Sequence, residues 1–223
     1  MIRFTEVASG AGVELTPRDV VLAGYTGRDQ EAVRRHVAEL AEHGVPAPER
    51  VPAFYRVTPE LVSVTERITV LGGETSGEGE FILFRADGTL FVGVGSDHTD
   101  RALEREDVAK SKQLCRKVVG GSVWRLDDIG PHWDHVVLRS FADGAATPYQ
   151  EGPVTSLLAP EEILRRVEAR SGRDLDDVLV FSGTIPLAGE LTYASHFRVA
   201  LDDELHALHV EVAYAIEVSD LLD

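Results

Sequence analysis

Two glutamates separated by a single glycine stand directly before an apolar run, in the segment 77–83 with the sequence GEGEFIL. On an extended strand, residues two apart point to the same side, so Glu78 and Glu80 are expected to lie side by side. Like charges at that spacing repel each other, and a hard divalent cation with oxygen ligands relieves the repulsion. The pattern predicts either half of a metal site or a solvent-facing pair on an edge strand, and the spacing alone favours the second interpretation.

A third carboxylate for such a site comes from the segment 95–101, Gly-Ser-Asp-His-Thr-Asp-Arg. This polar stretch follows an apolar strand, a position at which ligand-binding loops are common. Asp97 and Asp100 are both candidate ligands. The alternative interpretation is a turn in which Asp97 or Thr99 caps a following helix, and the residues alone leave the two equal.

His36 and Glu39 form the third feature. They lie three residues apart on a predicted helix, so they share a face and can form a hydrogen bond. A carboxylate beside an imidazole fixes its tautomer and raises its basicity, as a general base requires. A solvated surface pair is the simpler alternative. Lys110, in Ala109-Lys110-Ser111, carries no meaning by itself.

Composition bounds the classes of protein that could hold these residues. The 223 residues include 38 acidic and 22 basic side chains, a formal net charge of −16 that disfavours nucleic acid and anionic membranes as partners. No stretch approaches the roughly 18 apolar residues of a membrane helix. The N-terminus has no signal-peptide pattern, and one cysteine, Cys115, suits a reducing compartment. A cytoplasmic protein is expected.

The elements that must position these residues are mainly strands. Apolar positions predict a helix from Asp29, its N-cap, to about His43, and a second helix over 160–171. An Asp87-Gly88 pair predicts a hairpin between strands 80–84 and 89–94. Further strands are predicted at 18–23, 62–71, 136–140, 178–181 and within 193–218. The fold class is therefore mixed α/β, rich in strands, with few helices.

In this order the motifs resemble the fumarylacetoacetate hydrolase-like superfamily, and most closely an uncharacterised bacterial branch of it. Six weak motifs in one order are far more specific than any one alone, and they span most of the chain. The branch is indicated by Gly24-Tyr25-Thr26-Gly27-Arg28-Asp29, by Ser111-Lys112-Gln113-Leu114-Cys115 and by the stretch from Trp124 to Trp133. The six superfamily motifs are His36-Val37-Ala38-Glu39, Glu78-Gly79-Glu80, Asp97-His98-Thr99, Ala109-Lys110-Ser111, Gln150-Glu151-Gly152 and Ser182-Gly183-Thr184.

The resemblance implies a single catalytic domain over 1–223 with the family's mixed β-sandwich roll. Residues 1–60 would carry the His36 and Glu39 pair, and 61–223 would form a β-rich core with the metal site. The metal would be Mg²⁺ or Mn²⁺, and a homodimer is expected. The resemblance assigns Glu78, Glu80 and Asp97 to the metal, with Asp100 as the alternative third ligand, and it assigns His36, Glu39 and Lys110 to catalysis and Gln150, Thr184, Asp100 and Arg101 to the substrate.

The implied activity is metal-dependent chemistry on a small 2-keto or diketo acid through a metal-bound enolate. Hydrolysis of a C–C bond is the first expectation. Hydration, isomerisation and oxaloacetate-type decarboxylation share the same enolate and remain alternatives, as does a non-catalytic protein that binds small acids or metal. The spacing of His98, His132 and His135 does not match a zinc site. His132 and His135 are interpreted, with Trp124 and Trp133, as residues that pack and cap a loop.

Overall fold

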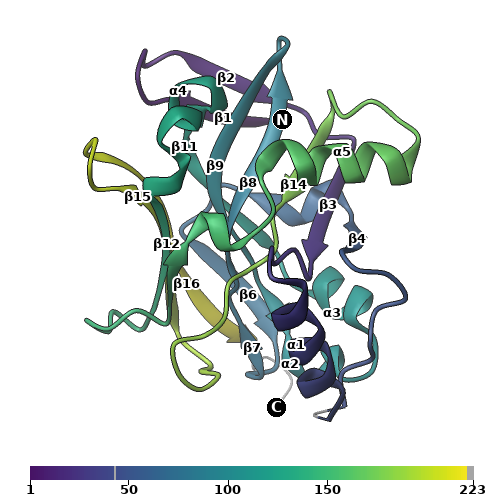
Figure 1. Ribbon diagram of the computed structural model, residues 1–223. Helices are drawn as coiled ribbons and strands as arrows, with labels where there is room; N and C mark the ends of the chain where they lie inside the picture. Colours follow the sequence, from purple (N-terminus) through teal and green to yellow (C-terminus); the bar gives the residue numbers. More distant parts are fainter. Residues whose placement is uncertain (43, 220–223) are drawn as a thin grey trace.

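The computed structural model describes residues 1–42 and 44–219, and Figure 1 shows two sheets with helices at their margins. In the described residues the larger sheet has nine strands, in the order β2-β1-β11-β9-β8-β14-β3-β4, with β5 beside β11. Its strands are β1 (Ile2–Glu6), β2 (Gly12–Leu15), β3 (Asp19–Gly24), β4 (Ala53–Val57), β5 (Val62–Ser63), β8 (Gly79–Ala86), β9 (Thr89–Asp97), β11 (Lys117–Arg125) and β14 (Val178–Phe181).

The second sheet has the order β13-β12-β15-β16-β6, and a two-strand ribbon pairs β10 with β7. Among the described strands of the second sheet, the pairing of β16 with β6 is parallel and the others are antiparallel. Its strands are β6 (Arg67–Leu71), β12 (Val136–Ala142), β13 (Gln150–Pro153), β15 (His196–Asp203) and β16 (Leu208–Ser219), and the ribbon consists of β7 (Thr75–Ser76) and β10 (Thr99–Asp100).

Helices are few in the described residues, as predicted. Figure 1 shows α5 beside β14 and β3, and α1, α2 and α3 grouped at one end of the molecule. The helices are α1 (Gln30–Glu42), α2 (Arg101–Glu104), α3 (Val108–Leu114), α4 (Leu126–Ile129) and α5 (Pro160–Ser171), with 3₁₀ turns η1 (Pro59–Leu61), η2 (Gly130–His135) and η3 (Val154–Ser156).

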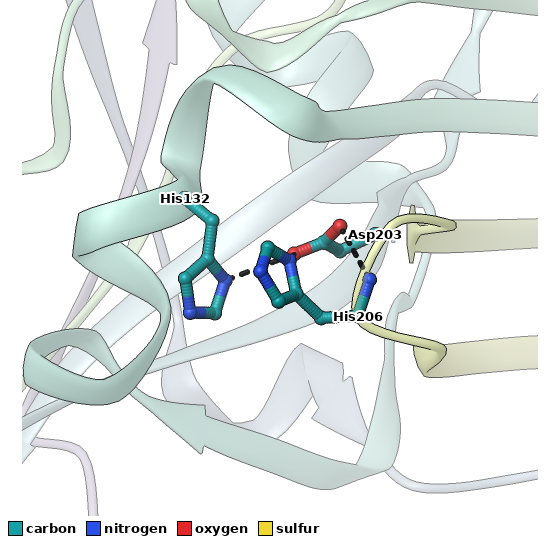
Figure 2. A group of neighbouring side chains, drawn as sticks. All are labelled: His132, Asp203 and His206. Carbon is teal, nitrogen blue, oxygen red and sulfur yellow. Dashed lines mark hydrogen bonds and ion pairs between the residues drawn. The ribbon is translucent and has the colours of Figure 1, made fainter.

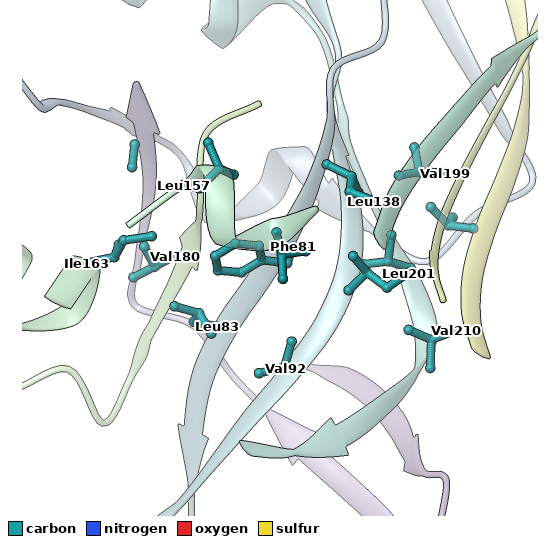
Figure 3. Packing of buried hydrophobic residues seen from close by; sticks show 14 of the residues in the cluster. Phe81, Leu83, Val92, Leu138, Leu157, Ile163, Val180, Val199, Leu201 and Val210 are labelled. Carbon is teal, nitrogen blue, oxygen red and sulfur yellow. The ribbon is translucent and has the colours of Figure 1, made fainter. Parts of the chain in front are cut away.

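Strand β8 shows how the core is built. Its residues alternate between two apolar clusters, so that Phe81 and Leu83 face one cluster while Ile82 and Phe84 face the other. The first cluster fills the space between the two sheets and includes Phe81 and Leu83 of β8 and Leu138 of β12, as Figure 3 shows. Because β8 lies between β9 and β14, it is an interior strand, and the edge-strand interpretation of Glu78 and Glu80 is wrong.

Several predicted elements are confirmed. The hairpin β8–β9 turns at Asp87 and Gly88, whose φ angles of 49° and 73° are the left-handed values that this dipeptide favours. Helix α5 begins at Pro160, and Gly172 follows it with a φ of 66°. Asp29 caps α1, since its carboxylate accepts the backbone N–H groups of Glu31 and Ala32. The predicted end of α1 at His43 lies outside the described residues.

The single strand predicted over 62–71 is wrong. The chain forms β5 beside β11 in the larger sheet and then, after a break at 64–66, forms β6 beside β16 in the other sheet. At the break the hydroxyl of Thr65 donates to the carbonyl of Arg67, which turns the backbone locally. Among the described residues, no helix combines the length and apolarity needed to cross a bilayer.

Candidate metal centre

Glu78, Glu80 and Asp97 meet where β8 begins and β9 ends. The antiparallel register pairs Gly79 with Ser96, and the backbone N–H of Asp97 donates to the carbonyl of Glu78 at 3.0 Å. One carboxylate oxygen from each of the three residues lies within 4.8 Å of the others. Glu80 and Asp97 are each 1% exposed, so this cluster of like charges is shielded from bulk water.

Three basic side chains surround these carboxylates. The Lys112 ammonium lies 3.0 Å from Glu78 Oε2 and also contacts Asp97 Oδ2. Lys117, which is fully buried, lies 2.8 Å from Asp97 Oδ1, and Arg101 Nη2 lies 3.1 Å from Glu78 Oε1. Buried charges of one sign need such partners, because an unpaired carboxylate is costly to remove from water.

The partners divide unequally among the carboxylates. Burial alone raises the pKa of Asp97, but the ammonium groups of Lys112 and Lys117 outweigh it and hold that pKa below its usual range. The pKa of Glu78 is likewise lowered, because Lys112 and Arg101 outweigh its burial. Burial and the charges of Asp97 and Glu78 raise the pKa of Glu80 well above its usual value, although the Gly183 N–H donates to it at 2.7 Å.

The donor set fits a hard divalent cation. It offers three carboxylate oxygens, the ligand type of Mg²⁺ and Mn²⁺. The Lys112 ammonium already places positive charge between Glu78 and Asp97, and a metal at these oxygens would replace it. Asp97 Oδ1 is buried without a well-aligned hydrogen bond, although the Lys117 ammonium is close. A cation would also stabilise the charged form of Glu80, which is otherwise disfavoured.

The structure distinguishes between Asp97 and Asp100, the two candidates for the third carboxylate. Asp97 faces Glu78 and Glu80. Asp100 instead caps α2, where its carboxylate accepts the backbone N–H of Leu103 at 2.8 Å. The structure therefore does not place Asp100 with the ligands, and its capping oxygen is not free for a substrate.

Arg101 reaches the edge of the centre. Its guanidinium binds Glu78, Glu104 and the hydroxyl of Ser76, so each of its three nitrogens has a protein partner. The side chain is 12% exposed. In this arrangement Arg101 orients Glu78, and contact with a substrate would require one of these bonds to open.

Lys110 does not reach the carboxylates. Its side chain is 75% exposed and pairs with Asp107 at 2.9 Å. Lys112, two residues further along α3, points into the centre instead, because residues two apart lie about 200° apart around a helix. The structure thus brings Lys112 to the carboxylates and does not bring Lys110 there.

His36 and Glu39 share one face of α1, but both are solvent-exposed, and His36 Nδ1 lies 3.9 Å from Glu39 Oε2, too far for a hydrogen bond. In α1 only Val33 is buried. The His36 ring is 6.3 Å from the ring of Tyr25, whose pKa rises to about 12 through burial and the nearby charges of Tyr55, Glu104 and Glu78. Tyr25 thus lies near His36 of α1 and is also close enough to Glu78 to feel its charge.

Gln150 and Thr184 lie directly behind the glutamates. Gln150 is fully buried, and its carbonyl oxygen accepts the Gly79 N–H at 2.9 Å and the Ser140 hydroxyl at 2.8 Å. Its amide nitrogen donates to Thr184 Oγ1 and to the Ile185 carbonyl, and the Thr184 hydroxyl donates to the Gly79 carbonyl. Both polar groups of Gly79, the residue between the two glutamates, are therefore held by this pair.

Reasoning from the sequence missed Lys112, Lys117 and Tyr25. Tyr25 has a φ of 58°, a left-handed conformation that a bulky residue rarely adopts, but no local pattern reveals it. Lys117 begins β11, and its pairing with Asp97 of the neighbouring strand β9 depends on sheet register. His98, in contrast, is structural: burial lowers its pKa to about 3, and it bonds to Tyr214 and Thr75.

Comparison with solved structures identifies the fold as that of fumarylacetoacetate hydrolase proteins. A Yersinia pestis protein provisionally named in that family superposes with a TM-score of 0.69 at 15% identity, over 96% of this chain and 99% of that one. The fumarylpyruvate hydrolase of Pseudomonas aeruginosa, solved with Mn²⁺ and pyruvate, superposes with a TM-score of 0.66 at 16% identity, over 98% of this chain and 96% of that one. A 5-carboxymethyl-2-hydroxymuconate delta-isomerase from Mycobacterium smegmatis superposes with a TM-score of 0.65 at 16% identity, over 95% of this chain and 84% of that one.

A family model also matches residues 23–214, most of the chain. The chain belongs to this family, which is described as protein of unknown function (DUF2848). No curated protein matches the sequence. The expected fold and the expected resemblance to an uncharacterised group are thus confirmed, while at these identities the solved structures bear on the fold alone.

Proposed function

We propose that the chain is a divalent-metal-dependent enzyme that acts on a small 2-keto or diketo acid, with C–C bond hydrolysis as its reaction. The observation that carries the proposal is the convergence of the Glu78, Glu80 and Asp97 carboxylates, two of which share the Lys112 ammonium. Resemblance to a fumarylpyruvate hydrolase solved with Mn²⁺ and pyruvate supports both the metal and the class of substrate. A bound Mg²⁺ or Mn²⁺ would supply Lewis acidity toward the carboxylate and keto oxygens of the acid.

Lys112 would bind the acid, and Arg101 would join it once one of its bonds to Ser76, Glu104 or Glu78 opens. Once its carboxylate partners turn to a metal, the Lys112 ammonium has to leave its place between Glu78 and Asp97. A substrate carboxylate or keto oxygen would then replace its lost partners, and the positive charge would stabilise negative charge that develops on that oxygen. Gln150 holds the Gly79 peptide rather than the substrate, so we assign it a positioning role.

His36 would move the proton. Its Nδ1 faces Glu39 at 3.9 Å, which leaves Nε2 as the atom that accepts a proton from water. Glu39 would hold the ring and stabilise its protonated form. Since α1 buries only Val33, we propose that the helix approaches Tyr25 and the carboxylates when the acid binds, and that this excludes bulk water.

A substrate panel tests the proposal. The purified chain is incubated with acylpyruvates, fumarylpyruvate and oxaloacetate, with Mn²⁺ or with a chelator, and products are followed by NMR. We expect metal-dependent cleavage of an acylpyruvate and a loss of about 10²–10⁴-fold in kcat for His36→Ala. Equal rates in His36→Ala and the wild type would remove the proton-transfer role.

The other outcomes assign the remaining candidates. Decarboxylation of oxaloacetate, or hydration or isomerisation without cleavage, would replace hydrolysis with that reaction. Mn²⁺ binding without turnover of any acid would leave a non-catalytic binding protein. The resemblance also supports a homodimer, which sedimentation tests: we expect one species at about twice the chain mass of 24.3 kDa.

A further inference from the structure

Two histidines and an aspartate form a second cluster, away from the carboxylates. His132 lies in η2, which directly follows α4, whereas Asp203 ends β15 and His206 lies in the turn to β16. Figure 1 shows α4 and β15 far from α3, which carries Lys112. The cluster therefore joins two segments about seventy residues apart and shares no side chain with the centre described above.

The two imidazoles converge on one oxygen. His132 Nδ1 lies 2.9 Å and His206 Nδ1 lies 2.7 Å from Asp203 Oδ2. The rings stack with centroids 3.9 Å apart and planes at 26°, so both Nδ1 atoms point to the same side, as Figure 2 shows. The ligand atoms of all three residues lie within 4.8 Å of one another.

Asp203 is a fixed anchor. The residue has no exposed surface, and its Oδ1 accepts the backbone N–H groups of Leu205 and His206, each at 3.2 Å. These bonds orient the carboxylate and direct Oδ2 toward the histidines, an outer-sphere arrangement typical of metal ligands. The His132 and His206 side chains are 22% and 40% exposed, so one side of the cluster opens to solvent.

We propose that His132, Asp203 and His206 form a binding site for a divalent transition metal, of the Zn²⁺, Co²⁺, Ni²⁺ or Cu²⁺ type. Two imidazole nitrogens and one carboxylate oxygen suit these ions, whereas the all-oxygen centre suits Mg²⁺ and Mn²⁺. Metal bonds of about 2.1 Å at tetrahedral angles hold donor atoms about 3.4 Å apart, so the two short contacts have to open by about half an ångström. His206 lies in an exposed turn that can make this shift.

The remaining coordination positions face water, and the bound ion clamps η2 to the β15–β16 turn. Because Trp133 of η2 packs edge-on against Phe81 at 5.3 Å, the clamp holds a residue that contacts β8, the strand that carries Glu80. We therefore expect the ion to raise the stability of the fold. The site stands independently of the proposed enzymatic function.

Calorimetric titration of Zn²⁺ into the untagged full chain tests the site. The titration uses a Glu80→Gln background, so that the carboxylate centre does not contribute. We expect one Zn²⁺ to bind and the melting temperature to rise. His132→Asn and His206→Asn, substitutions in two different segments, should each weaken binding at least about tenfold.

His209→Asn is the matched control, since His209 Nδ1 also lies 2.7 Å from an aspartate, Asp202, on the same hairpin, but its ring stacks on no other imidazole in the described part of the chain. It should leave Zn²⁺ affinity unchanged. Pulsed EPR of bound Cu²⁺ should show coupling to two imidazoles in the background protein and to one in either asparagine variant. No Zn²⁺ binding, equal affinity in His206→Asn, or Cu²⁺ without imidazole coupling would each overturn the site and leave a hydrogen-bonded trio.

Discussion

Replacing Lys112 by methionine should destabilise the metal-free protein, and added metal should reduce that loss of stability. The ammonium lies 3.0 Å from Glu78 Oε2 and also contacts Asp97. With an effective dielectric constant of about 20, two unit charges at that distance attract by about 5 kcal/mol. The cost of burying the ammonium offsets part of this, and removal of one partner of a buried pair destabilises a protein by about 3–5 kcal/mol.

Lys117 and Arg101 remain beside the carboxylates in Lys112→Met, so the lower end of this range is expected, about 3 kcal/mol. For a chain of this size, that loss lowers the melting temperature by about 6–12 °C. Added Mn²⁺ should reduce the difference in free energy of unfolding between Lys112→Met and wild type. In the wild type, the metal must displace the Lys112 ammonium from Glu78 and Asp97, whereas in Lys112→Met no ammonium lies between these two carboxylates.

The assay is urea unfolding with a chelator and with saturating Mn²⁺. Lys110→Met is the matched control, because Lys110 lies on the same helix with its side chain 75% exposed, and it should behave like wild type under both conditions. If Lys112→Met is as stable as Lys110→Met in the chelator, the ammonium does not stabilise the carboxylates. If the difference in free energy of unfolding between Lys112→Met and wild type is the same with Mn²⁺ as with the chelator, the Lys112 ammonium and the metal do not compete for the same carboxylate oxygens.

Three further substitutions test the same geometry. Burial and the charges of Asp97 and Glu78 raise the pKa of Glu80 above its unfolded value, so metal-free wild type should lose up to about 1.4 kcal/mol per pH unit as pH rises through that folded pKa. In Glu80→Gln the free energy of unfolding, measured with urea at a series of pH values, should fall less with pH. If the wild type and Glu80→Gln lose stability equally with pH, the raised pKa is contradicted. Gln150→Leu leaves the Gly79 N–H unsatisfied, so it should cost about 1–3 kcal/mol in urea unfolding and weaken Mn²⁺ in calorimetry; unchanged Mn²⁺ affinity would remove its positioning role. Gly183→Ala adds a Cβ 2.8 Å from the Ala23 carbonyl at a φ of 88°, so it should lower the melting temperature, whereas Gly189→Ala, with open space, should not; equal melting temperatures would show that the close approach is relieved at no cost.

The local patterns of the sequence predicted the elements that depend on neighbours in the chain. The Asp87-Gly88 turn, the Pro160 start and the Gly172 end of α5 each follow from backbone preferences of the residues themselves. The strand break at 64–66 could not be predicted in this way, because alternation continues on both sides while the two halves pair with different sheets.

In the candidate site, too, the residues that follow from local spacing could be predicted, and those that depend on tertiary contacts could not. Glu78 and Glu80 could be identified from their spacing, since Glu80 lies at the start of β8 and Glu78 directly precedes that strand. Choosing Lys112 over Lys110 requires knowing which side of the short helix α3 faces β9, and the helix has no apolar stripe long enough to show it. The pairing of His132 with His206 is a tertiary contact between distant segments, which spacing within either segment cannot reveal.

The most direct measurement is anomalous diffraction from crystals grown with Mn²⁺. We predict one anomalous peak bonded to an oxygen from each of Glu78, Glu80 and Asp97 at about 2.2 Å, with the Lys112 ammonium moved away from Glu78. A map without a peak at these oxygens, with Lys112 still bound between Glu78 and Asp97, would contradict the metal centre.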